Sequence, residues 1–150
     1  MDGGGLEMIN SFSGEYAWLS NFYEAPIRDE HHLTYPTVEH YFQAKKAVSY
    51  EDMLEIARAA TPGEAKKLGR RVSMRHDWEQ IKLGVMEEAL RKKFSIPELR
   101  DKLIATGDEE LVEGNWWHDT YWGVCDGTGQ NNLGLLLMKI RKELQDDNAC

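Results

Sequence analysis

The sequence has little cysteine and no long apolar run. Its 150 residues include two cysteines, Cys125 and Cys150, and Cys150 stands at the end, where chains usually fray. We therefore expect no structural disulfide and a reducing, intracellular compartment. Apolar stretches such as Leu133–Met138 are far too short to span a bilayer. The first residues also lack the basic and apolar segments of a secretory signal.

The spacing of a zinc site is absent as well. The five histidines are scattered, and the adjacent His31 and His32 are better explained by a polar loop than by a metal pair. We expect neither a metal nor a cofactor, and no repeat or low-complexity segment is visible.

Positive charge is in deficit, with 18 Lys and Arg against 26 Asp and Glu and a net charge of −8. This balance argues against broad electrostatic binding of DNA or of an anionic membrane. It leaves room for a small pocket that takes an anionic ligand. The size, with 41% apolar and 10% aromatic residues, predicts one globular domain with a core rather than a disordered chain.

Helix signals dominate after Pro36. Residues 7–35 predict short strands and turns, because β-formers are broken there by Gly, Asn and Pro. Thr37, Thr61 and Ser95 are expected to precede helices as caps. The predicted helices cover about 38–48, 49–60, 62–69, 77–94, a segment from 96 and 132–144, with a short strand at 111–113 and a loop over 114–131. The expected fold is α+β, a single compact domain over residues 10–144, mostly helical with short N-terminal strands, and with flexible ends at 1–9 and 145–150.

One predicted helix carries an unusual face. Glu39, Phe42, Gln43 and Lys46 follow i, i+3, i+4, i+7 spacing, so they lie on one side of a helix. A core stripe would place Leu or Val there. The simpler interpretation is a first-turn acid facing the helix dipole and a solvated lysine at the other end. The functional interpretation is a carboxylate and an amine at the rim of a pocket.

Three further segments suggest ligand binding. Residues 115–123 contain three tryptophans and one tyrosine between turn residues, which suits stacking of a planar base but also packing under a loop. Glycines at 127–134 precede a helix and suit a phosphate or a plain turn with an Asn cap. Residues 66–75 hold five basic residues and no acid, which indicates either a solvated helix face or a phosphate site.

These segments, taken together, resemble the NADAR or YbiA-like domain family over about residues 10–144. The matching pieces, in order, are 20–23, 35–44, 65–70, Asp77-Trp78, Met86, Lys93-Phe94, 105–107, 111–113, 121–123 and 129–141. No single piece is diagnostic, but their order and spacing are.

The resemblance implies an N-glycoside hydrolase that cuts the bond between ribose C1′ and a nitrogen. Two substrate groups are associated with the family: ribosylamino-pyrimidine phosphates of riboflavin synthesis, and ADP-ribose attached to guanine bases of DNA. The family acid falls on Glu39 and the family lysine on Lys46, with Lys45 as a one-residue alternative. The family tryptophans fall on Trp78 and Trp122, and the acid before the latter on Asp119. The tryptophans at 116 and 117 lie outside the family pattern.

The chemistry fits these residue types. A carboxylate can stabilise positive charge at C1′ or move a proton, and an amine in an apolar pocket can attack C1′ or its aldehyde form. We assign catalysis to Glu39, Lys46 and Asp119. Substrate binding is assigned to Ser20, Asn21, Phe22, Phe42, Gln43, Arg70, Trp78, Trp122, Gly123, Gly129 and Asn131.

Three alternatives remain. ADP-ribosyl-guanine, including ADP-ribosylated DNA, is slightly favoured over the pyrimidine phosphates because no riboflavin-pathway module is fused to the domain. A module that binds ADP-ribose or a nucleotide without cleaving it is the rival of another class, although a binder has no need of both Glu39 and Lys46. A plain helical scaffold leaves the aromatic loop and the basic island unexplained. No membrane partner is expected.

Overall fold

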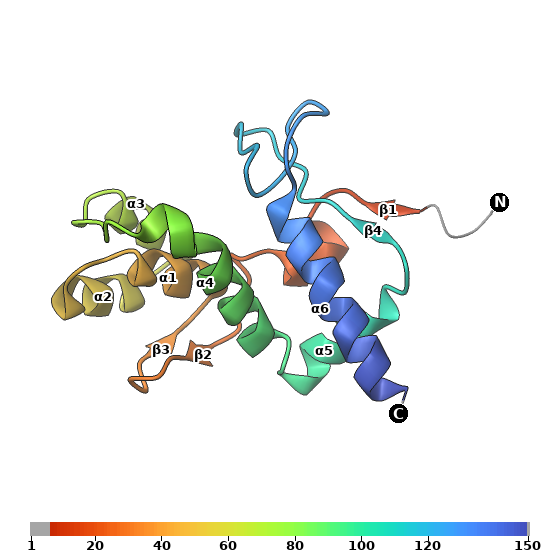
Figure 1. The fold of residues 1–150 in the computed structure, drawn as a ribbon, viewed down its shortest axis with the longest axis horizontal. Coiled ribbons are helices and arrows are strands. Elements are labelled where there is room, and N and C mark those ends of the chain that lie inside the picture. The colour runs from red at the N-terminus through yellow and green to blue at the C-terminus, as the bar shows by residue number, and fades with distance from the viewer. Residues whose placement is uncertain (1–6, 150) are drawn as a thin grey trace. The chain divides into compact units, whose positions relative to one another are not determined.

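Helices make up most of the regular structure in the computed structural model, which describes residues 7–149 (Figure 1). The fold class is α+β, as predicted. In chain order the elements are β1 (Met8–Ile9), a 3-10 helix (Gly14–Leu19), β2 (Ile27–Arg28), β3 (Thr34–Tyr35), α1 (Val38–Lys45), α2 (Tyr50–Ala57), α3 (Pro62–Gly69), α4 (Trp78–Lys93), α5 (Pro97–Ala105), β4 (Glu110–Leu111) and α6 (Asn132–Asn148). Within residues 7–149, no helix has the length and apolar character needed to cross a membrane.

Two units make up the chain. The α1–α4 unit comprises residues 21–93, and the terminal unit comprises residues 1–20 with 94–150. Of the ends expected to be flexible, residues 1–6 and Cys150 lie outside the described residues. Residues 8–9 form β1, which pairs in parallel with β4.

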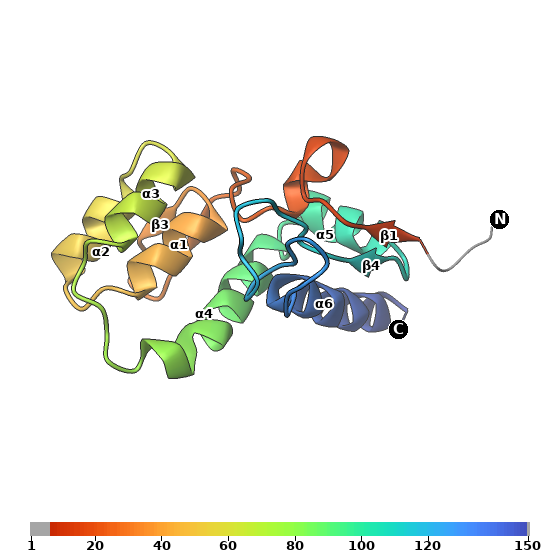
Figure 2. The same cartoon turned by 90° about the horizontal axis from the view of Figure 1, so that it is seen from above.

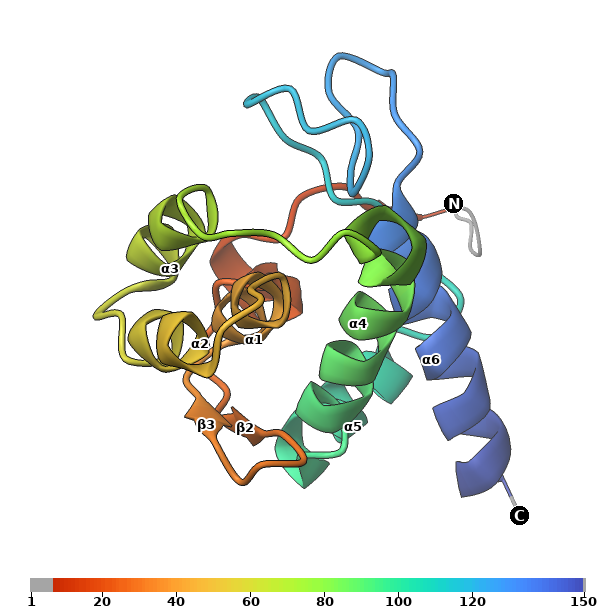
Figure 3. The same cartoon turned by 60° about the vertical axis from the view of Figure 1, so that its left-hand side comes forward.

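Helix α1 is the centre of the α1–α4 unit. It packs against α2, α3 and α4, and Figure 3 shows α2 and α3 beside it. All eight of its residues are buried, Glu39, His40, Gln43 and Lys45 included. Burying polar groups is costly unless they are hydrogen-bonded, so the partners of these side chains determine how the unit is built.

His40 shows how one such group is satisfied. The Thr37 hydroxyl caps α1 by accepting from the His40 N–H at 3.1 Å, and it also lies 2.8 Å from His40 Nδ1. On the far side of the ring, Nε2 lies 3.0 Å from the Ala59 carbonyl oxygen. Because a carbonyl only accepts, Nε2 carries the proton and Nδ1 accepts from Thr37. Burial lowers the pKa of His40, which keeps the ring neutral.

Helices begin where the sequence predicted at the positions where a hydroxyl group caps the first turn. Thr61 accepts from the Glu64 N–H at 3.1 Å, and the Glu64 carboxylate accepts from the Ala60 N–H at 3.1 Å, which is a capping box. The prediction for Ser95 was wrong. Helix α5 begins at Pro97 with Ile96 as its N-cap and no side-chain cap, because proline fixes the first turn without needing a donor.

The terminal unit is built on α5, α6 and β4, which pack together. Figure 2 shows α5 and α6 with the β1–β4 pair. Helix α6 runs to Asn148 rather than ending at 144 as expected. Gln145 anchors the added turn by donating to the Ile104 and Gly107 carbonyls, at 3.4 and 3.0 Å.

Charge is divided unevenly between the units. Residues 21–93 carry 13 Lys and Arg against 12 Asp and Glu, a net charge of +1. The terminal unit carries 5 against 14, a net charge of −9. The acidic total of the chain therefore belongs to the terminal unit, and the α1–α4 unit carries no net charge barrier to an anion.

Candidate functional site

Glu39 and Gln43 form a buried pair on α1. Gln43 Nε2 donates to the Glu39 carboxylate at 2.7 Å. Gln43 is 5% exposed and Glu39 is 7% exposed. Gly69, the last residue of α3, lies directly against the Gln43 side chain, and a methyl group at position 69 would overlap it. The predicted i, i+4 relation is therefore real, and α3 fixes its geometry by close approach.

Lys46 lies in the electrostatic field of the same pair. Burial lowers the pKa of its amine; the Glu39 carboxylate opposes this shift, whereas Arg70 and Lys66 add to it. An amine with a lowered pKa is a better nucleophile near neutral pH. Lys46 is half-buried and follows α1 as its C-cap. The structure thus brings Glu39, Lys46 and Arg70 into one neighbourhood.

Lys66 belongs with these charges, although its sequence pattern gave it no separate site role. It lies on α3 four residues before Arg70, the C-cap of that helix, so both side chains point to the same side of the helix. The basic run over 66–75 did contain it, and the i, i+4 spacing was the signal that could have separated it from its neighbours.

An aromatic pair and an asparagine complete this part of the unit. The rings of Phe42 and Trp78 lie with centroids 4.9 Å apart and are tilted by 56°. The Asn21 carbonyl accepts from the Glu39 N–H at 3.1 Å, while its side-chain Nδ2 lies 3.6 Å from Met86 Sδ. Two buried amide oxygens, Asn21 Oδ1 and Gln43 Oε1, have no hydrogen-bond partner within the described residues, and such groups usually indicate an absent ligand or water. Phe22, the next residue, is 45% exposed.

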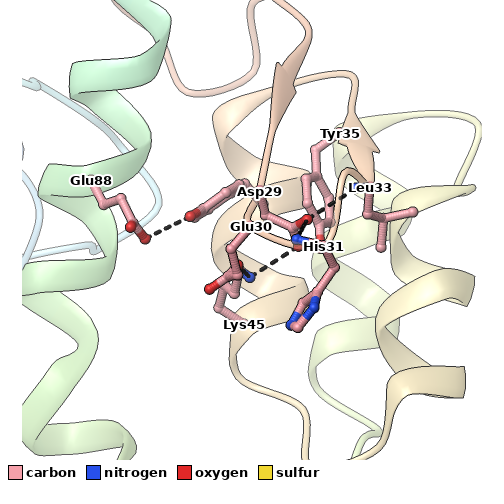
Figure 4. Close-up of polar contacts among 8 residues, drawn as sticks. Asp29, Glu30, His31, Leu33, Tyr35, Lys45 and Glu88 are labelled. Carbon is pink, nitrogen blue, oxygen red and sulfur yellow. Dashed lines mark hydrogen bonds and ion pairs between the residues drawn. The ribbon is translucent and has the colours of Figure 1, made fainter.

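Lys45 has a different environment (Figure 4). Its amine contacts Asp29 at 3.0 Å and Glu30 at 2.7 Å and lies 5.2 Å from the centre of the Tyr41 ring. Tyr35 donates to the same Asp29 oxygen at 2.8 Å. Burial opposes ionisation of Asp29, but the bonds from Tyr35 and Lys45 outweigh it and hold its pKa at about 2. Lys45 is thus committed to a structural ion pair, which leaves Lys46 for the Glu39 face.

The other predicted residues lie in the terminal unit. Asp119 Oδ1 accepts from the backbone N–H groups of Tyr121 and Trp122, at 3.1 and 2.9 Å. Asn131 has a left-handed backbone (φ 54°) and does not cap α6 with its side chain. Instead it bonds to the Leu111 carbonyl at 2.9 Å and the Glu113 N–H at 3.0 Å. Both residues therefore support the loop that carries them.

The remaining predicted positions have backbone roles. Gly123 and Gly129 lie in contact, because a side chain at 129 would overlap the Gly123 carbonyl. Ser20 is the C-cap of the 3-10 helix and donates its N–H to Ala17.

A groove of about 960 Å³ lies on α2 and α3, and its lining includes Glu51, Glu55, Arg58, Lys67 and Arg71. It contains none of the predicted catalytic residues. The mixture of carboxylates and cations at its wall is largely exposed and lacks the buried pair that distinguishes the Glu39 face. We therefore place the candidate site on the Glu39 face.

Comparison with known proteins agrees with the resemblance. The NADAR domain family model matches residues 10–145. N-glycosidase YbiA of Escherichia coli is 44% identical over 138 residues, covering 89% of this chain and 85% of the relative. N-glycosidase Npun_R5314 of Nostoc punctiforme is 41% identical, covering 87% of each chain. The NMR structure of E. coli YbiA superposes with a TM-score of 0.85 at 41% identity, covering 95% of this chain and 88% of that one.

A longer relative adds a metabolic context. A protein named riboflavin biosynthesis protein VVA0006, from Vibrio vulnificus, is 38% identical over 87% of this chain, which spans 36% of that protein.

The packing of Gly69 on Gln43 predicts an inversion of the usual helix preference. Alanine normally stabilises a helix by about 0.5–1 kcal/mol over glycine. We expect Gly69→Ala to lower the free energy of unfolding by about 1–3 kcal/mol, because the new methyl displaces Gln43. Gly84→Ala on α4, where a methyl meets open space, is the control and should stabilise. Denaturant unfolding measures both, and a stabilised Gly69→Ala variant would contradict the contact.

The Asp29 ion pair predicts a pH-dependent loss. We expect Asp29→Asn to reduce the free energy of unfolding by about 2–3 kcal/mol at neutral pH, because it leaves a buried ammonium with one exposed partner. The folded pKa of Asp29 is lowered, so its contribution is complete above the unfolded value near 4 and is lost as the pH falls toward 2. Unfolding curves at several pH values measure this difference between wild type and variant.

Glu30→Gln is the matched control, since the Glu30 side chain is 64% exposed and should contribute less than about 1 kcal/mol. Equal losses in the two variants, or a difference that does not shrink in acid, would show that the buried carboxylate is not the anchor.

Proposed function

We propose that this chain, which belongs to the NADAR domain family and is a hydrolase of N-glycosyl bonds, cleaves the C1′–N bond of a phosphorylated ribose N-glycoside. The observation that carries the proposal is the buried Glu39–Gln43 pair on α1, which is followed by the half-buried Lys46 at the C-cap of the same helix. The charges of Glu39, Arg70 and Lys66 all act on the Lys46 amine. A carboxylate and an amine supply the chemistry, and two further cations supply a counter-charge for phosphate. The family and the N-glycosidase relatives support the same reaction class.

The reaction separates charge at C1′. As the C1′–N bond breaks, the bonding pair leaves with the nitrogen of the base and positive charge develops on C1′ and the ring oxygen. The Glu39 carboxylate stabilises that charge and accepts a proton from the incoming water, whose oxygen forms the new bond to C1′. The departing nitrogen needs one proton, and Glu39 can supply the proton that it took from the water. Glu39 therefore acts first as a base and then as an acid.

Lys46 has two roles compatible with its environment. In its protonated form it can pair with the Glu39 carboxylate and attract the phosphate. In its neutral form, which burial favours, its nitrogen can attack C1′ and be released by water. Both roles need the amine beside the carboxylate, and we assign catalysis to this pair.

Sugar and phosphate are assigned to neighbouring groups. Arg70 and Lys66 meet the phosphate, which a guanidinium binds well. The buried oxygens Gln43 Oε1 and Asn21 Oδ1 accept from ribose hydroxyls, which would satisfy them. Phe42 and Trp78 offer an aromatic surface to the sugar.

The predicted residues of the terminal unit keep supporting roles in this proposal. Asp119 orients the backbone that carries Trp122, so we propose it as a positioning residue and Trp122 as a contact for the base. The same assignment covers Gly123, Gly129 and Asn131, whose contacts shape the loop, and Ser20 and Phe22 remain proposed binding residues.

Two substrates satisfy the proposal. The ribosylamino-pyrimidine phosphates are supported by relatives that carry riboflavin biosynthesis in their names. ADP-ribosyl-guanine, free or in DNA, is the second candidate, because the two cations Lys66 and Arg70 offer a counter-charge to its diphosphate. No metal enters either assignment.

The first test removes the carboxylate charge without changing its shape. We expect Glu39→Gln to reduce kcat at least about 100-fold on whichever N-glycoside is cleaved, because the charge at C1′ loses its counter-ion. The purified protein is offered both substrates side by side, with release of the free base as the readout and thermal unfolding as the check on folding. Full turnover by the variant would refute the assignment. ADP-ribose binding by calorimetry, with no product from any N-glycoside, would favour a binding module.

A second test separates Lys66 from the neighbouring Lys67. Lys66→Ala should raise KM about tenfold with little change in kcat, because it removes one charge-assisted contact to the phosphate. Lys67→Ala is the matched control, since Lys67 is exposed and lines the α2–α3 groove instead. Steady-state kinetics of the two variants measure the difference. Identical KM values would mean that the phosphate binds elsewhere.

A further inference from the structure

Trp116 and Trp117 form an exposed indole pair in the terminal unit. They are 82% and 46% exposed, which is unusual for the largest apolar side chain, since tryptophan is well buried on average. Their ring centroids lie 5.5 Å apart with the planes at 88°. An edge-to-face contact covers only one broad face, so this indole pair presents open ring surface to solvent.

The loop that carries the indole pair is braced from within. Asn115 Nδ2 donates to the Asp119 carbonyl at 2.9 Å, and the Asp119 N–H donates back to Asn115 Oδ1 at 3.0 Å. Next to these two hydrogen bonds, the Asn115 N–H donates to the Val124 carbonyl and the Val124 N–H donates to the Glu113 carbonyl, both at 2.9 Å. The indoles are thus held at the tip of a closed five-residue loop. Because the loop is already ordered, less conformational entropy is lost when a ligand binds.

The charge around the loop restricts what can bind there. Residues 103–138 contain six Asp and Glu and not one Lys or Arg, within a unit of net charge −9. A phosphate would be repelled by this stretch. A neutral planar ring meets no such penalty, and it gains from stacking on indole.

We propose that Trp116 and Trp117 form a binding platform for an uncharged planar heterocycle. The ligand class is a neutral nucleobase or a ring of the same kind, and the platform is formed by residues of the terminal unit alone. Phosphate recognition plays no part in it.

The direct experiment follows the indole N–H signals of the 15N-labelled full chain by NMR. Guanosine and uridine should shift the signals of residues 116 and 117, which Trp116→Phe and Trp117→Phe identify. Ribose 5-phosphate should leave them unmoved. Trp18, 7% exposed in the same unit, is the internal reference and should not shift with any probe.

Binding affinity supplies a second readout. Trp116→Ala should weaken the binding of guanosine about tenfold or more, in line with the loss of one stacked base. Trp116→Phe should restore much of the affinity because it restores a ring. Tyr50→Ala is the control, since Tyr50 is 52% exposed but lies in the α1–α4 unit, and its affinity for guanosine should equal that of the wild type.

Failure of the platform and failure of the proposed function give different results. If an N-glycoside is cleaved while no nucleoside shifts the indoles and Trp116→Ala binds guanosine as the wild type does, the platform is refuted and the function stands. If no N-glycoside is cleaved but nucleosides still shift both indoles, the platform stands and the function falls. Shifts caused by an arginine-containing peptide, and by neither nucleoside, would assign the indole pair to a cationic protein partner and overturn the proposal.

Discussion

The complete burial of a polar helix is the constraint on which the α1–α4 unit depends. Helix α1 contains Glu39, His40, Gln43 and Lys45, and all of them lie inside. Each must therefore find a partner from another segment or another turn. His40 is held between Thr37 and Ala59, Lys45 between Asp29 and Glu30. These contacts fix the orientation of α1 about its own axis. The side chains on its other face, Glu39 and Gln43, are therefore preorganised.

The proposed function rests on the other face of α1, which carries Glu39 and leads to Lys46. The Glu39 carboxylate shares its buried surroundings with Gln43 and with the amine of Lys46. A carboxylate and an amine in a poorly solvated place interact more strongly than they would in water. The cost of keeping them there is met by the contacts of the rest of α1. In the function that we propose, N-glycosidase activity is tied to the stability of this unit, because the ion pair of Lys45 with Asp29 and Glu30 leaves Lys46 for the Glu39 face.

The division of charge sharpens what the net charge of the sequence means. A total of −8 argued against binding by bulk electrostatics, and the acidic terminal unit is the source of that total. The α1–α4 unit is nearly neutral and holds the run of five cations at 66–75. The run of cations and the aromatic loop therefore belong to chemically different units.

Local signals made much of this predictable, and long-range contacts made the rest unpredictable. The Thr37 and Thr61 caps, the α3 start and the Glu39–Gln43–Lys46 face follow from spacing alone. The sequence could not separate Lys45 from Lys46, because the Asp29 that binds Lys45 lies 16 residues away. The sequence was also wrong about a side-chain cap from Asn131, because the Asn131 amide bonds instead to Leu111, which lies 20 residues away. The end of α6 was missed because Gln145 is anchored by Ile104, a residue of α5 that lies 41 residues away in the sequence.

A structure of the full chain with ribose 5-phosphate bound would show where the sugar and its phosphate lie. We expect C1′ to face the Glu39 carboxylate and the Lys46 amine, with the phosphate on Lys66 and Arg70. A sugar phosphate bound instead in the groove on α2 and α3, against Arg58 and Lys67, would contradict this expectation.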